Sequence, residues 1–117
     1  MDKPKKLILD YSKWRCGMYG DDSLGEGDTA LLNNAGFMCC LGQFGKQCGI
    51  PEDELLNRGE PCECETRVPL FEKDGGAFVV AAININDDEN TTPEAKLNAI
   101  ETLLREEGIE LEVINKP

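Results

Sequence analysis

The chain has 117 residues, a length that predicts one domain over residues 1–117, because two independent cores need more chain. It contains no histidine, which excludes imidazole-based catalysis, and no apolar run approaches the roughly 20 residues of a membrane helix. The formal net charge of −11 argues against direct binding of nucleic acid, which needs a basic surface.

The N-terminal part of the chain predicts a strand, a loop and a short helix, in that order. Residues 6–11 are rich in strand-forming side chains and predict the first strand. Residues 15–28 hold four glycines and four acidic residues, a composition typical of a surface loop. Thr29, with Asp28 as an alternative, can cap a short helix that carries residues 31 and 32.

Two further helices are expected before the middle of the chain. Apolar residues three and four positions apart predict an amphipathic helix over residues 37–47. Gly42 and Gly45 weaken this helix by propensity, and we expect them to allow another element to pack closely. Pro51 then begins a short helix that extends to Asn57, with acidic residues in its first turn.

The C-terminal half contains the most clearly specified elements. Residues 60–76 show no usable periodicity. Residues 77–85 are apolar except for Asn84, so that a buried strand and a short helix remain alternatives there. Thr92 is a suitable N-cap and Gly108 a suitable stop for one helix. Residues 109–113 alternate between apolar and acidic side chains, which predicts a half-buried strand.

These elements predict an α+β fold, with a small sheet that includes the N- and C-terminal strands and is packed by three to four helices. The sheet is expected to pack against the helix that precedes the last strand, because the connection at Gly108 is short.

Six cysteines are present, at positions 16, 39, 40, 48, 62 and 64. The start of the chain lacks the pattern of a secretory signal, so we expect reduced thiols in a cytoplasm. The favoured interpretation is that Cys39, Cys40 and Cys48 pack as small apolar side chains and that Cys62 and Cys64 are loop thiols, with no cofactor. A zinc site of four thiolates, formed by Cys62 and Cys64 with Cys16 and Cys39, is the alternative, although one residue between two cysteines is not the usual zinc spacing.

The glycine-rich loop offers an alternative site for a small ligand. Its glycines can leave backbone N–H groups available to an anion near a helix start, although the loop lacks the lysine and the spacing of a phosphate-binding loop. The residues of this candidate site are Trp14, Arg15, Gly25, Gly27 and Thr29.

Acidic residues are concentrated in the second half of the chain. Residues 60–117 carry 14 acidic and 5 basic side chains, whereas residues 1–59 carry 9 and 7. Such a surface steers a basic partner protein, and the alternative is that it serves solubility alone. The candidate partner-binding residues are Glu60, Glu63, Glu65, Asp87, Asp88 and Glu89.

Several short motifs spread over the chain form one pattern. They are Asp10, Ser12-Lys-Trp14, Gly25 and Gly27 before Leu31-Leu32, Gly36, Met38-Cys-Cys-Leu-Gly42, Gly49-Ile-Pro51, Asn86-Asp87 and Gly108-Ile109. The set resembles a family of small uncharacterised proteins of bacteriophages and prophages, and Met-Cys-Cys-Leu-Gly is its most specific part. Cysteines 16, 48, 62 and 64 and the acidic second half depart from that pattern. The resemblance implies a phage origin and no particular mechanism.

The resemblance and the lack of a catalytic constellation lead to one functional expectation. We expect a phage-encoded accessory protein, not an enzyme, that binds and modulates a host or phage protein with a basic surface in the bacterial cytoplasm. Inhibition of a host anti-phage defence system is one form of such modulation. The alternatives are a small-ligand-binding protein that uses the glycine-rich loop, and a zinc- or thiol-dependent factor.

Overall fold

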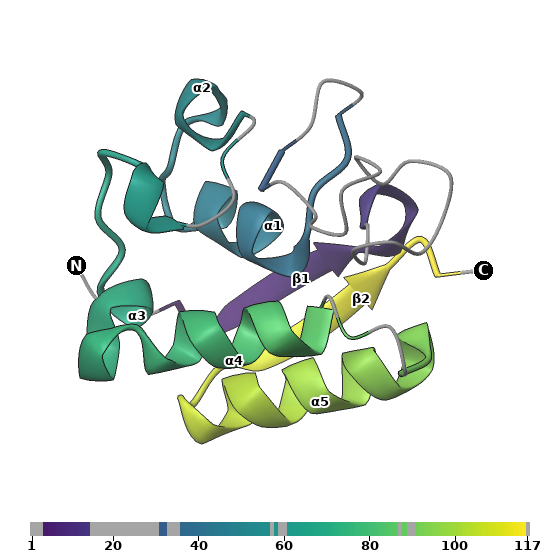
Figure 1. Cartoon of the computed structure of the whole chain (residues 1–117). Coiled ribbons are helices and arrows are strands. Elements are labelled where there is room, and N and C mark those ends of the chain that lie inside the picture. Colours follow the sequence, from purple (N-terminus) through teal and green to yellow (C-terminus); the bar gives the residue numbers. More distant parts are fainter. Residues whose placement is uncertain are drawn as a thin grey trace.

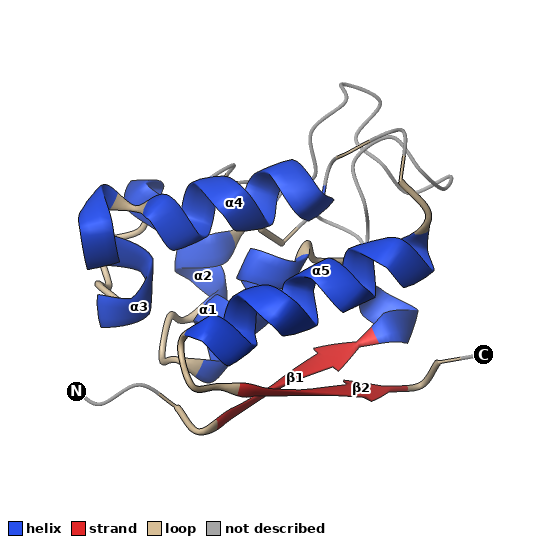
Figure 2. Cartoon of the chain, turned by 90° about the horizontal axis from the view of Figure 1, so that it is seen from below, coloured by secondary structure: helices blue, strands red, loops and turns tan. Residues whose placement is uncertain are grey.

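The fold is built around two strands from opposite ends of the chain. The computed structural model describes residues 4–14, 31–32, 36–56, 58, 61–86, 88 and 91–116. Strands β1 (Lys6–Asp10) and β2 (Glu110–Ile114) pair in parallel, although they are the first and last elements in the described part (Figure 1). The helices lie on one side of these strands (Figure 2). The predicted α+β fold, with a sheet of N- and C-terminal strands, is therefore confirmed.

The chain between the strands is mainly helical. The described residues form the helices α1 (Cys40–Gln47), α2 (Glu52–Leu55), α3 (Pro69–Glu72), α4 (Ala77–Asn86) and α5 (Pro93–Glu106), with 3-10 turns η1 (Tyr11–Lys13), η2 (Pro61–Glu63) and η3 (Lys73–Gly75). Among these described helices, none has both the length and the apolar character that a membrane span requires.

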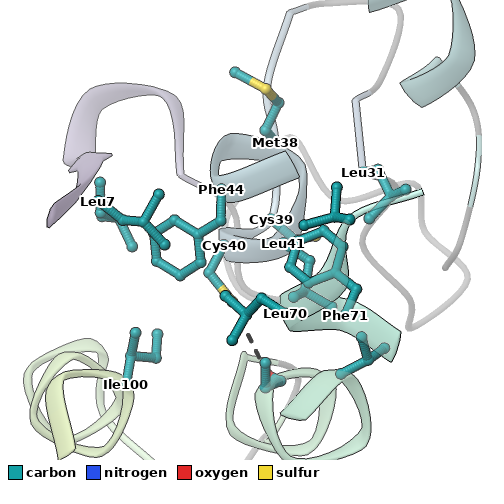
Figure 3. Close-up of a cluster of buried hydrophobic side chains, with 14 of the residues drawn as sticks. Leu7, Leu31, Met38, Cys39, Cys40, Leu41, Phe44, Leu70, Phe71 and Ile100 are labelled. Carbon is teal, nitrogen blue, oxygen red and sulfur yellow. Dashed lines mark hydrogen bonds between the residues drawn. The ribbon is translucent and has the colours of Figure 1, made fainter. Parts of the chain in front are cut away.

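The core lies between the sheet and the helices. Leu7 and Leu9 on β1 are buried, and they pair in register with Leu111 and Val113 on β2. The buried side chains Leu97, Ile100 and Leu104 form the inner face of α5. Figure 3 shows Phe44 of α1, which is fully buried, next to Leu7 in the same cluster.

Helix α1 closes the outer edge of β1 with two glutamine side chains. The Gln47 side chain accepts a hydrogen bond from the Ile8 N–H at 2.7 Å and donates one to the Ile8 carbonyl at 2.6 Å. Gln43 makes the same pair of bonds with Asp10, at 2.6 and 3.1 Å. Residues four apart lie on one face of a helix, so the two amides satisfy outward-pointing backbone groups of β1 as a neighbouring strand would.

The prediction of a helix around residues 31 and 32 is wrong at those two residues. The Leu31 N–H donates to the Arg58 carbonyl at 2.7 Å, and Leu32 forms an isolated parallel bridge with Leu56. These long-range backbone bonds replace the local helical ones. Gly42 permits this arrangement, because a Cβ atom on it would lie 1.7 Å from the Leu31 carbonyl oxygen. The expectation that Gly42 allows close packing is thus confirmed.

The other helix predictions differ mainly at their ends. Helix α1 begins at Cys40 instead of Phe37, because Met38 forms a bridge with Trp14 and its N–H donates to the Lys13 carbonyl at 2.9 Å. Helix α2 spans Glu52–Leu55 and is shorter than the predicted 51–57.

Helices α4 and α5 precede and follow residue 90. Residues 77–85, left open between strand and helix, belong to helix α4. Helix α5 matches its prediction, since the Thr92 hydroxyl accepts a hydrogen bond from the Ala95 N–H at 3.2 Å and Gly108 adopts a φ of +76° after the helix.

Candidate functional site

The described surface contains an apolar groove beside the N-terminal half of α4. It encloses about 170 Å³, which is below the roughly 300–1,000 Å³ of pockets for drug-sized ligands. Its lining is mostly apolar and comprises Pro61, Cys62, Thr66, Arg67, Val68, Phe71, Gly75, Gly76, Val79 and Val80. The size and the lining suit one or two apolar side chains of another protein better than a cofactor.

The floor of the groove is formed where α3 packs against α4. Pro69 takes the first position of α3, where its missing N–H costs nothing. The rings of Phe71 and Phe78 stack with their centroids 6.1 Å apart, which holds the two helices together. Asp74, Gly75 and Gly76 all have positive φ values, from 53° to 91°, so that the chain reverses direction in a tight left-handed turn.

A hydrogen-bonded carboxylate holds the opposite wall in place. The two oxygens of Glu54 accept hydrogen bonds from the Thr66 N–H at 2.7 Å and the Thr66 hydroxyl at 3.1 Å. These bonds hold the pKa of the Glu54 carboxyl below its usual value. The Cys64 thiol also donates to the Glu54 carbonyl, at 3.3 Å. The segment over residues 61–66 is therefore attached to α2.

The outer face of α4 extends the apolar surface beyond the groove. None of the ten residues of α4 is charged, in a chain of which 30% is charged. Val80 is 57% exposed, the highest fraction among the large apolar side chains of the described part. Contiguous exposed apolar surface marks interaction sites, so the groove together with the exposed Val80 is a candidate for one.

Exposed acidic side chains lie in the segment that forms one wall of the groove and after the C-terminal end of α4. Glu63 and Glu65 are exposed in the segment over residues 61–66 that forms one wall of the groove, and Asp88 is exposed after the C-terminal end of α4. Arg67 faces Glu72 at 3.8 Å, so this cation is partly offset. Of the six predicted partner-binding acids, the structure therefore places three in two separate groups. The other three, Glu60, Asp87 and Glu89, lie outside the described residues.

A buried polar junction joins four segments behind α4. The Asn86 side-chain oxygen accepts hydrogen bonds from the Trp14 indole N–H at 2.7 Å and from the Cys40 N–H at 3.1 Å. The Asn86 carbonyl accepts a third from the ammonium of Lys96 at 2.7 Å. All four residues are at most 4% exposed. The junction thus serves packing, and it brings together Trp14, Cys40 and Asn86, which lie in three different segments of the chain.

The predicted ligand site falls largely outside the described part of the chain. Trp14 is buried, and its ring packs edge-on against Tyr11 with centroids 5.6 Å apart. The remaining members of that site, Arg15, Gly25, Gly27 and Thr29, lie outside the described residues, so the site stays a prediction.

The cysteines of the described segments occupy different environments. Cys39 and Cys40 are buried at the start of α1, and the Cys40 thiol lies 4.0 Å from the Ala82 carbonyl (Figure 3). Burial raises the pKa of the Cys64 thiol, and the charge of Glu54 raises it further. Cys62 is exposed in the groove. Cys16, a member of the alternative zinc site, lies outside the described residues, and within them no three cysteine or acidic side chains group as metal ligands would.

Comparisons of the chain with family models, with curated proteins and with solved structures found no match.

The groove and the polar junction were not apparent from the sequence. Both depend on contacts between segments far apart in the chain, such as Glu54 with Thr66 and Trp14 with Asn86. The one local indication is the absence of charge over residues 77–86.

Proposed function

We propose that this protein acts by binding a segment of another protein in the groove beside α4. The observation that carries the proposal is the continuity of an apolar groove with the uncharged, exposed outer face of α4, centred on Val80. An apolar side chain of the partner occupies the groove, and its burial supplies about 25 cal/mol per Å² of apolar surface.

The charges near the groove indicate which charge the bound segment of the partner carries. Glu63 and Glu65 leave a negative rim on a protein of net charge −11. A complementary segment carries lysine or arginine next to its apolar anchor, which gives fast association and orientation. This deepens the expectation of a partner with a basic surface.

The resemblance to small phage proteins supports a bacterial setting for this binding. The protein is then a phage-encoded accessory factor in the host cytoplasm, and its partner is a host or phage protein whose activity it modulates. Such binding would inhibit a defence system if the segment held in the groove is needed for the activity of that system. A protein that binds without catalysis is sufficient for this.

Comparative affinity capture from bacterial lysate tests the proposal. Wild type, Val80→Glu and Leu56→Glu serve as baits, since Val80 and Leu56 are both exposed apolar residues, at 57% and 40%, and only Val80 lines the groove. We expect a protein that wild type and Leu56→Glu retain equally and that Val80→Glu loses. Equal capture by all three baits would contradict the proposal.

A further inference from the structure

The two edges of the sheet differ in how their backbone groups are satisfied. The outward groups of β1 are bonded by Gln43 and Gln47. On β2, the Glu110 N–H donates to the Lys5 carbonyl at 3.0 Å, so residues 110, 112 and 114 direct their backbone groups toward β1. Backbone direction alternates along a strand. The N–H and C=O groups of Leu111 and Val113 therefore point to the outer edge.

Within the described segments, no hydrogen bond reaches these outer groups of Leu111 and Val113. Their side chains pack against the core, so the backbone of this edge is held in the extended conformation that another strand requires. Proteins usually cover or distort such an edge, because it is a template for pairing. Among the residues that the structure describes, the edge of β1 is covered and that of β2 is not.

A second cavity lies alongside this edge. It encloses about 290 Å³ between the last turns of α5 and the start of β2, with Arg105, Gly108 and Leu111 among its lining residues. A strand added to β2 would direct every second side chain to the helix side of the sheet, where this cavity offers space.

We propose that β2 accepts an extended segment of another protein as an added antiparallel strand. Leu111 and Val113 each exchange two backbone hydrogen bonds with that segment, as in other cases of strand addition. The proposal concerns a different surface from the groove beside α4, so either can hold without the other.

The charges on the sheet identify the kind of segment. Lys6, Asp10, Glu110 and Glu112 alternate with the core-facing residues and lie on the face away from the helices, so this face carries three acids and one lysine. Lys6 already pairs with Glu112 at 2.6 Å. A segment with lysine or arginine at alternate positions complements this face, because opposite charges on neighbouring strands attract.

The same charges disfavour a second copy of this chain as the occupant. An antiparallel pair of β2 strands that uses all the outer groups sets Leu111 opposite Val113 of the other copy. Glu112 then stands directly opposite Glu112 of the other copy, and like charges at such positions destabilise the pair. The acidic face thus favours a basic partner over self-association.

Two short blocked peptides provide the test. In the first, lysine and valine alternate; in the second, the same sequence carries methyl groups on the valine nitrogens, which removes the donors and leaves the charge unchanged. In NMR titrations of the whole protein, we expect the first peptide to shift the amide signals of Leu111 and Val113 and to protect both amides from exchange. The methylated peptide should bind at least about tenfold more weakly.

Variants of β2 separate backbone pairing from charge. Val113→Pro removes an outward N–H without touching the ladder to β1 and should abolish binding, whereas Val113→Ala keeps the N–H and should bind. Equal binding of the two peptides to wild type would overturn the proposal, as would the absence of shifts at Leu111 and Val113 with millimolar peptide. Formation of a dimer in sedimentation experiments, lost in Val113→Pro, would overturn the assignment of the occupant.

Discussion

At the scale of single residues, Asn86 joins three other segments of the chain through hydrogen bonds, and the sequence alone does not predict this role. Its side chain and carbonyl receive hydrogen bonds from Trp14, Cys40 and Lys96, which belong to the N-terminal segment, α1 and α5. Polar groups at such depth are costly without partners. The sequence offers only a weak indication, a polar residue at the end of an apolar run, because Trp14 and Cys40 lie 72 and 46 residues away in the chain.

Replacement of Asn86 tests the junction. In Asn86→Ala, two buried N–H groups lose this acceptor, so the free energy of unfolding should fall by roughly 2–6 kcal/mol, at about 1–3 kcal/mol for each buried group. Asn84→Ala makes the same change at an exposed position of the same helix and should cost less than about 0.5 kcal/mol. Urea unfolding measures both, and equal losses would contradict a specific role of Asn86.

The second residue-scale prediction concerns Glu54 and pH. Its hydrogen bonds from Thr66 lower the pKa of the folded carboxyl below the usual value of 4.5 for this group. A lowered folded pKa means that the stabilisation is complete above pH 4.5 and is lost as the pH falls through the folded pKa. Urea unfolding of wild type and Glu54→Gln should therefore give stabilities that differ at pH 7 and converge under acid. A difference that stays constant with pH would contradict the assignment.

At the scale of elements, the sequence predicted those whose limits are set locally. Helix α5 has its cap at Thr92 and its stop at Gly108, and both act within a few residues of the chain. Helix α4 has no polar face, so periodicity could not distinguish it from a strand. The helix predicted at Leu31 is absent because its N–H donates to the Arg58 carbonyl, and no local sequence pattern predicts such a bond. The short helix α3 fell in a stretch without periodicity.

The packing of α5 on the sheet leads to the third prediction. Leu104 is 0% exposed, whereas its neighbour Leu103 is only partly buried. Leu104→Ala should lower the free energy of unfolding by roughly 2–5 kcal/mol, the range for a buried leucine, and Leu103→Ala should cost clearly less. A loss below about 1 kcal/mol for Leu104→Ala would mean that this stripe does not face the core.

At the scale of the whole molecule, a strongly acidic protein presents one helix, α4, that carries no charged side chain. Most acids lie in the second half of the chain, and the sequence predicts this region as a candidate surface for a basic partner. It did not indicate that the acids over residues 63–65 border an apolar groove. That arrangement depends on the packing of α3 on α4 and on the bonds between Glu54 and Thr66.

The fourth prediction concerns this charge. Charges at the rim of an interface act mainly on the association rate and are screened over about 8 Å at physiological salt. Association of the captured partner with Glu65→Lys should be several-fold slower than with wild type at low salt and nearly equal in high salt. Glu94→Lys, an exposed reversal in the first turn of α5, is the control. Stopped-flow rates that are equal for wild type and Glu65→Lys at low salt would favour the solubility interpretation of the acids.

The most direct test of the groove as a binding surface uses the cysteine that it already contains. Cys62 is exposed and lines the groove, whereas Cys48 is only partly exposed and lies at the end of α1. The measurement is the rate of alkylation of each thiol, followed by peptide mass spectrometry, for the protein alone and for its complex with the captured partner. The account predicts that the partner slows alkylation of Cys62 strongly and leaves that of Cys48 unchanged. Alkylation of Cys62 at the same rate in the saturated complex would contradict it.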